Sequence, residues 1–473
     1  MTITTLPEKE NTASGSRQTA PQGIQPAQAA SSQQPSLIRS LGLGDATLLV
    51  VGCIVGVGIF RSASSIANHV HQPALILALW LIGGILSVCG ALCYAELAAM
   101  FPATGGDYVY MTKIYGRFWG FLFGWTKLFV ERTGTIAILV FFFAEYLSRA
   151  IPYGGANAQR WVAAATVVGL TAINIAGIQW GKIVQNLFTM LKISALGSIV
   201  AAGVWIFLSH QNSSPNWQTP ALTGSAIQSM GVGLVFVLFA FGGWTEAAYV
   251  AEEIKEPTRN VPRAILQGLL LTAVLYLLVS WCYLLAVPVA ELPATPLVAA
   301  RVMQAAIGPA GGTFIALMIA CSAFGASNGY ILTGARILYA VGKDHALFAK
   351  LGTLHPVHRT PALALWANAA VAAFLVFTKT FDQIATYSTV AISVFFTMTV
   401  FGVIILRRRL PNQPRPYRAW GYPVTPILFC LTMIGFIINI WMKEPKEALF
   451  GFGFMAIGIP LYWFSSRLKQ PDV

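Results

Sequence analysis

The amino-acid sequence predicts an all-α integral membrane protein with twelve transmembrane helices. Of the 473 residues, 56% are hydrophobic and only 10% are charged, whereas an ordinary soluble protein carries about 25% charged residues. The apolar residues also occur in runs long enough for helices that cross a bilayer, which takes about 20 residues. An outer-membrane barrel would show shorter, alternating segments instead.

The first 38 residues are expected to form a disordered tail. They are rich in Gln, Ser, Ala, Pro and Thr and nearly devoid of large apolar side chains, so they cannot bury enough surface to fold. They also lack the apolar core of a signal peptide. The membrane domain therefore begins at about residue 39.

Twelve apolar runs follow this tail, and each is interpreted as one membrane span. They are residues 43–67, 73–99, 118–148, 159–178, 185–208, 227–250, 263–287, 311–340, 361–378, 383–406, 423–442 and 447–466.

The Lys and Arg residues of the connections predict the orientation. Alternate connections, starting with the N-terminal tail and ending with the C-terminus, hold 20 of them, against 6 on the opposite side. Cytoplasmic loops carry the excess of positive charge, so both termini are expected in the cytoplasm and the protein in the cell membrane. The net charge of +13 thus reflects topology, and no nucleic-acid partner is expected.

The first span contains Gly52, Gly56 and Gly58 at its centre, and each glycine costs a helix about 1 kcal/mol relative to Ala. We therefore expect the helix to unwind near Gly56–Gly58. The second half-helix would then offer N–H groups to an anion, and the carbonyls that end the first half would accept from a cation. Such a site suits a zwitterion. The alternative is that Gly52 and Gly56 only allow close helix packing.

A second interruption is expected in the sixth span, at Gly242 and Gly243. Five spans separate the two breaks, so the two interrupted spans cross the membrane in opposite directions. This arrangement is typical of an inverted-repeat transporter with a site near the midplane. Trp244 lies beside the second break and is expected to close over a ligand, with packing as the alternative.

Ionisable residues within spans are costly and are functional candidates. Lys127 and Glu131 have the i, i+4 spacing of an ion pair, with Arg132 adjacent. Lys192 has no acidic partner in its own helix, so it needs backbone carbonyls, hydroxyls or a distant carboxylate. It is expected to play a mechanistic role, with snorkelling toward the interface as the alternative. Glu246 follows the second break, and could face the site, a proton path or a partner such as Lys192.

Other polar groups carry weaker indications. Ser327 and Asn328 lie between two glycines of the eighth span and would line a cavity or form packing hydrogen bonds. The six histidines are expected in solvated loops or span ends, and the six cysteines as small buried residues. No metal site and no cofactor are predicted.

Several segments resemble the amino acid–polyamine–organocation superfamily, and within it the L-type transporters that are light chains of heteromeric exchangers. They are Gly56–Phe60, Gly90–Leu97, Gly105–Tyr108, Phe239–Trp244, Glu252–Pro262 and Gly325–Gly329. The resemblance covers residues 40–410 and implies a 5+5 inverted repeat (the leucine-transporter-type fold) with two extra helices. The repeats would be residues 39–208 and 226–406, followed by residues 407–473.

The resemblance also implies a substrate site. Gly56, Val57 and Gly58 would donate to the substrate carboxylate. Gly243 and Trp244 are expected at the site from their position at the second break, not from the resemblance. Lys192 would occupy the place of a sodium ion of sodium-driven relatives. The backbone carbonyls expected to accept from the substrate ammonium are those of Cys53, Ile54, Phe239 and Ala240.

Three departures from the family pattern matter. Val57 replaces a serine, so a hydroxyl contact is lost although backbone donation survives. Thr245 replaces an asparagine, which affects side-chain selectivity. Residues 149–160 contain no cysteine, so no disulfide-linked heavy subunit is expected.

The expected function is sodium-independent transport of L-amino acids, most of all neutral ones, by alternating access. A transporter of cationic amino acids or polyamines is the nearest alternative, because of Glu246. A membrane-embedded enzyme and a channel are the remaining alternatives, but the sequence shows no acidic metal-binding cluster and no nucleophile–histidine pair.

Overall fold

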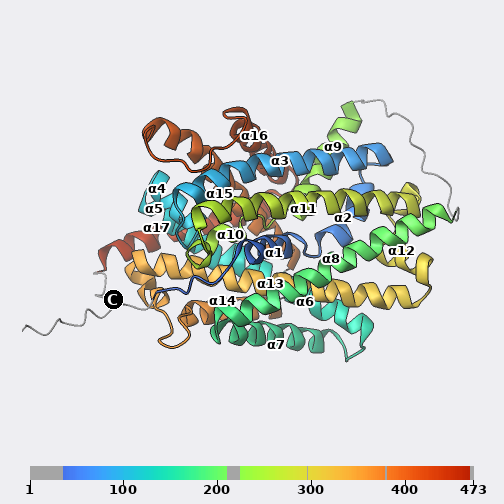
Figure 1. Ribbon diagram of the computed structural model, residues 1–473, viewed down its shortest axis with the longest axis horizontal. Coiled ribbons are helices and arrows are strands. Elements are labelled where there is room, and N and C mark those ends of the chain that lie inside the picture. Colours follow the sequence, from blue (N-terminus) through green and yellow to red (C-terminus); the bar gives the residue numbers. More distant parts are fainter. Residues whose placement is uncertain (1–35, 210–223, 296, 379–380, 469–473) are drawn as a thin grey trace, which may run out of the picture. The chain divides into compact units, whose positions relative to one another are not determined.

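The computed structural model describes residues 36–209, 224–295, 297–378 and 381–468, and most of these residues are helical (Figure 1). Within the described residues, extended pairing is limited to a bridge between Leu41 and Ile254. The predicted tail lies almost entirely outside the described residues, as does most of the boundary between the two predicted repeats.

The helices follow one another along the whole chain. They are α1 (Leu43–Ile54), α2 (Gly58–Ala67), α3 (Pro73–Met100), α4 (Asp107–Tyr115), α5 (Arg117–Thr126), the π-helix η1 (Lys127–Glu131), α6 (Arg132–Ala150), α7 (Ala156–Ile175), α8 (Ile178–Leu208), α9 (Gly224–Ala240), α10 (Glu246–Tyr249), the 3₁₀-helix η2 (Ala251–Glu253), α11 (Pro257–Ala286), η3 (Val289–Glu291), α12 (Val298–Ile307), α13 (Ala310–Asp344), η4 (Ala346–Gly352), α14 (Ala362–Phe377), α15 (Phe381–Arg409), α16 (Val424–Lys443) and α17 (Pro445–Arg467).

Eight helical segments of the described chain are long and apolar enough to cross a membrane, judged by length and composition: 43–67, 73–100, 178–208, 257–286, 310–344, 389–409, 424–443 and 448–467. Every one of the twelve predicted ranges overlaps helical residues. The third predicted span is divided by η1, the sixth by its break, and the ninth is only 16 residues long in α14. The count of twelve therefore remains a prediction.

The helix α1 packs against α8, α11 and α13, while α2 packs against α9 and α12 (Figure 1). At some of these contacts, glycine allows two helices to approach each other closely. A Cβ added to Gly52 would lie 2.2 Å from Nε2 of Gln185 on α8, and one added to Gly203 would lie 2.4 Å from Cβ of Cys282 on α11. Small residues bring helix backbones together in membranes, so the packing role considered for Gly52 is confirmed.

His345 corrects the expectation that the histidines are solvated. It directly follows α13 and is 5% exposed, with its ring 5.0 Å from that of Phe121 and 6.2 Å from that of Tyr108. Burial lowers the pKa of His345 to about 4, partly opposed by Asp344 and assisted by Arg117. In the sequence, His345 lies in a short connection after a long apolar run. Nothing there indicated that aromatic side chains surround it.

Acid is expected to destabilise the protein through His345. The unfolded pKa is about 6.5, so the stability contributed by the neutral imidazole is complete above that pH and is lost as the pH falls toward 4. Thermal unfolding of the purified protein between pH 7 and pH 4.5 measures this loss. The His345→Phe variant should lose less stability over the same range, and an identical pH profile would contradict the assignment.

Candidate functional site

The first interrupted span consists of α1 and α2, with Val55, Gly56 and Val57 between them. The prediction of a break at this position is confirmed. The Gly56 amide donates to the Ile54 carbonyl at 2.8 Å, which forms a tight link. Because α2 begins at Gly58, its first N–H groups have no acceptor within the helix. These donors lie at the positive end of the α2 dipole, where an anion is favoured.

The second predicted break is also confirmed. Helix α9 ends at Ala240 and α10 begins at Glu246. Gly243, between them, has φ = +108°, a conformation that favours glycine. The Gly242 amide donates to the Phe239 carbonyl at 3.0 Å, so this carbonyl keeps one further lone pair for a ligand.

The two breaks lie against each other. A Cβ added to Gly58 would be 3.1 Å from Cα of Ala240, and one added to Gly243 would be 2.9 Å from the carbonyl carbon of Cys53. The backbones of the two interrupted spans therefore lie in direct contact at their breaks.

Tyr276 on α11 joins the two breaks, and the sequence analysis missed it. Its hydroxyl lies 3.0 Å from the Ile54 carbonyl oxygen and 3.3 Å from that of Ala240. The Ile54 oxygen thus already has two donors, the other being the Gly56 amide. A substrate ammonium at Ile54 would have to replace one of them. A buried tyrosine in an apolar span was the available signal.

Ser322 on α13 was missed as well. Its hydroxyl lies 3.0 Å from the carbonyl oxygens of both Val55 and Gly56. These carbonyls belong to the unwound link between α1 and α2. By donating to them, the Ser322 hydroxyl on α13 stabilises the break. A hydroxyl between Cys321 and Ala323 in an apolar run was its only sequence signal.

Trp244 packs inside an aromatic cluster. It is 3% exposed, and its ring centroid lies 4.9 Å from that of Tyr94, 5.6 Å from that of Phe396 and 6.2 Å from that of Phe429. In this conformation Trp244 therefore has the packing role, which was the alternative considered for it. Closure of Trp244 over a ligand remains a prediction.

Lys192 on α8 is fully buried, and its ammonium donates to the Gly52 carbonyl of α1 at 2.5 Å. Of the three kinds of partner expected for it, the structure therefore shows a backbone carbonyl. One turn before it, the hydroxyl of Thr189 donates to the Leu48 carbonyl at 3.1 Å. The buried cation thus connects α8 to the half-helix that leads into the first break.

Ser327 and Asn328 form hydrogen bonds between and within helices. The Ser327 hydroxyl donates to the Ala323 carbonyl at 2.8 Å. The Asn328 amide donates to the Gly181 carbonyl at 3.0 Å and to the Gln185 side chain at 3.1 Å. Both side chains are fully buried, which agrees with the packing role considered for them.

A buried ion pair links Glu246 to Arg132, and this corrects the suggestion of Lys192 as its partner. The Arg132 guanidinium lies 3.0 Å from Glu246, which also accepts from the Thr333 hydroxyl at 2.5 Å. The guanidinium carbon is 5.2 Å from the ring centroid of Tyr249 and 4.9 Å from that of Tyr330. Three helices, α6, α10 and α13, meet at this carboxylate.

The ion pair predicted between Lys127 and Glu131 is confirmed at 2.8 Å, within the π-helix η1 that precedes Arg132. Arg132 also lies 3.9 Å from Glu131. Lys127, Glu131, Arg132 and Glu246 therefore form one buried group of two basic and two acidic side chains.

Breaking the Arg132–Glu246 pair is expected to destabilise the protein by about 3–5 kcal/mol, because it leaves one buried charge uncompensated. Arg132→Gln and Glu246→Gln should each show this loss in thermal unfolding, and the double variant should cost less than the sum of the two. Glu145→Gln is the control, since its pair with Arg149 is exposed and worth about 0–1 kcal/mol. If the loss of stability in the double variant equalled the sum of the two single losses, Arg132 and Glu246 would not be energetically coupled.

A backbone clamp holds the segment before α1. The amide of Leu41 donates to the Glu253 carbonyl at 2.9 Å, and that of Lys255 donates to the Leu41 carbonyl at 2.8 Å. The Glu253 carboxylate receives two bonds from Arg336 of α13, at 3.1 and 2.9 Å. The end of each interrupted span is thereby fixed to the other and to α13.

Comparison with known proteins places this architecture in a family. A family model described as "Amino acid permease" matches residues 41–463. The serine/threonine exchanger SteT of Bacillus subtilis is 30% identical over 92% of this chain and 98% of its own length. The b(0,+)-type amino acid transporter 1 of Mus musculus is 30% identical over 92% and 91%. The large neutral amino acids transporter small subunit 2 of the same species is 30% identical over 90% and 81%.

The helical segments and the two facing breaks define a multi-pass membrane protein of the transporter class. With the match over nearly the whole described chain, the protein belongs to the amino acid permease family.

Proposed function

We propose that this protein carries neutral L-amino acids across the cell membrane, and that the substrate binds between the two breaks. The observation that carries the proposal is the contact between the breaks. The amides at Val57 and Gly58 suit a carboxylate, and carbonyls such as those of Phe239 and Cys53 suit an ammonium. The named activities of the relatives, exchange of serine and threonine and transport of large neutral amino acids, support the substrate class.

Lys192 supports the proposal that transport is independent of sodium. Its ammonium is held by a backbone carbonyl of α1, so a fixed positive charge is already present beside the first break. A protein cation at this place makes a bound metal cation unnecessary for stabilising the unwound backbone.

Alternating access requires contacts that hold one state and separate in the other. The clamp at Leu41 and Glu253 and the pair of Arg132 with Glu246 both join an interrupted span to α6 or α13. We infer that the described conformation is closed at the end where Leu41 lies, and that these contacts open when the substrate leaves toward that side.

The proposed architecture comprises twelve spans in a 5+5 inverted repeat with two additional helices. Both termini face the cytoplasm, as the distribution of Lys and Arg supports. A covalent heavy subunit is not proposed, because the connection between α6 and α7 contains no cysteine.

Transport of cationic amino acids or polyamines is the second candidate, motivated by Glu246. The pairing of Glu246 with Arg132 weakens it, since the carboxylate charge is already balanced. Neutral substrates are therefore favoured.

Proteoliposomes test the proposal. Labelled serine, threonine, leucine, arginine and putrescine are offered with and without internal amino acid, and with sodium or potassium outside. We expect uptake of neutral amino acids that is stimulated by internal neutral amino acid and unchanged by sodium. Uptake confined to arginine or putrescine, or dependent on sodium, would contradict it.

A further inference from the structure

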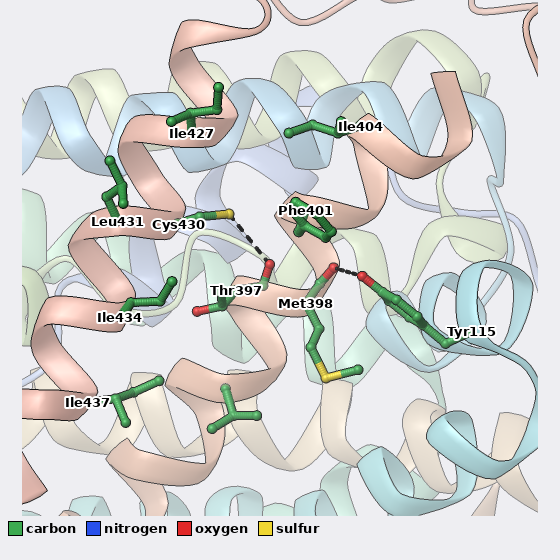
Figure 2. A pocket seen from close by; sticks show the side chains of 11 residues that line it. Tyr115, Thr397, Met398, Phe401, Ile404, Ile427, Cys430, Leu431, Ile434 and Ile437 are labelled. Atoms are coloured by element: carbon green, nitrogen blue, oxygen red, sulfur yellow. Dashed lines mark hydrogen bonds between the residues drawn. The ribbon is translucent and has the colours of Figure 1, made fainter. Parts of the chain in front are cut away.

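An apolar groove of about 550 Å³ runs between α15 and α16, outside the region of the two breaks. Its lining extends from Val394 to Ile404 on α15 and from Ile427 to Ile437 on α16, with Tyr115 at one side (Figure 2). Ten residues of helix rise about 15 Å. This length equals half of the hydrocarbon core of a bilayer, about 30 Å in total.

The polar side chains in the groove lining bond to the protein itself. The Tyr115 hydroxyl donates to the Met398 carbonyl at 2.8 Å, and the Cys430 thiol donates to the Thr397 carbonyl at 3.6 Å (Figure 2). The Thr397 hydroxyl donates to the Ser393 carbonyl at 2.7 Å. With these groups satisfied internally, the surface suits a hydrocarbon chain.

One end of the groove is strongly basic. Helix α15 ends in Arg407, Arg408 and Arg409, and the connection to α16 adds Arg415 and Arg418. Three of these five arginines have partners in the protein. Arg407 and Arg415 lie 2.5 and 3.4 Å from the Glu96 carboxylate, and Arg409 donates to the Ile114 carbonyl at 3.2 Å.

The remaining arginines are exposed, and no salt bridge joins Arg408 or Arg418 to an acidic side chain within the described residues. Arg408 follows Ile404 by one helical turn, about 6 Å. Trp420, 75% exposed, lies in the same connection, and tryptophan is enriched at the level of lipid headgroups.

We propose that the groove binds one anionic phospholipid, such as phosphatidylglycerol. Its acyl chain would lie along the groove, and its phosphate would contact Arg408 and Arg418, because guanidinium groups bind phosphate with paired hydrogen bonds. Basic residues directly beyond a membrane span attract anionic lipids. This site is independent of the proposed substrate site.

Native mass spectrometry of the purified protein with phosphatidylglycerol and phosphatidylcholine in equal amounts tests the proposal. Wild type should retain one phosphatidylglycerol in preference to phosphatidylcholine. Affinity for phosphatidylglycerol should fall roughly 30-fold in Arg408→Gln/Arg418→Gln, from the loss of two basic residues near the headgroup. Arg263→Gln, which removes an exposed charge at the start of α11, should leave it unchanged.

A second pair of variants tests the groove itself. Ile434→Trp fills it and should abolish retention, whereas Ile438→Trp, on the same helix and outside the lining, should not. Thermal unfolding checks that all variants are folded. Equal retention of both lipids, full competition by glycerol phosphate without acyl chains, or a dimer that closes the groove without lipid would overturn the proposal.

Discussion

Transport is expected to be lost when Gly243 becomes alanine. The φ of +108° at this position is unfavourable for any residue with a Cβ, and such strain costs about 1–3 kcal/mol. The new Cβ would also lie 2.9 Å from the Cys53 carbonyl carbon, so the two breaks would be pushed apart. We expect uptake to fall at least about tenfold, the factor that corresponds to 1.4 kcal/mol.

Gly231→Ala is the matched control for this variant. It lies in α9, the same interrupted span, where an added Cβ meets nothing within 4 Å. Uptake in proteoliposomes and thermal unfolding are measured for both variants. Wild-type uptake by Gly243→Ala would show that the contact between the breaks is not required for transport.

Replacing Lys192 is expected to reduce transport more than it reduces stability. The ammonium makes a charge-assisted hydrogen bond to the Gly52 carbonyl, and such bonds are worth about 1.5–3 kcal/mol. The expected loss of uptake is therefore roughly 10- to 150-fold. Lys192→Met keeps most of the packing volume and removes the charge, so it should show nearly the same loss as Lys192→Ala.

Lys182→Ala provides the comparison on the same helix. Its ammonium lies 3.5 Å from Asp45 and is partly exposed, so its removal should change uptake little. If Lys192→Met transports as well as the wild type, the charge has no part in the mechanism. If both Lys192 variants are unfolded, the role is structural.

The positions of the two breaks were predictable from the sequence because glycine acts locally. Gly56, Gly58 and Gly243 disfavour a continuous helix wherever they stand in an apolar run. The apolar runs themselves predicted the helices, since their length is fixed by the bilayer. The i, i+4 pair of Lys127 and Glu131 was predictable for the same reason, being set by helix geometry.

The partners of distant side chains were not predictable. Arg132 and Glu246 are separated by 114 residues, and only the packing of α6 against its neighbours brings them together. Tyr276 and Ser322 are ordinary residues in their own helices, and become part of the site because their hydroxyls reach carbonyls exposed by unwinding in α1. No local pattern encodes such contacts.

The most direct test is an experimental structure of the protein with a bound transported amino acid. We expect density for the ligand between residues 55–58 and 239–244, with its carboxylate within hydrogen-bond distance of the Val57 and Gly58 amides. A ligand bound elsewhere, or uninterrupted helices through Gly56 and Gly243, would contradict it.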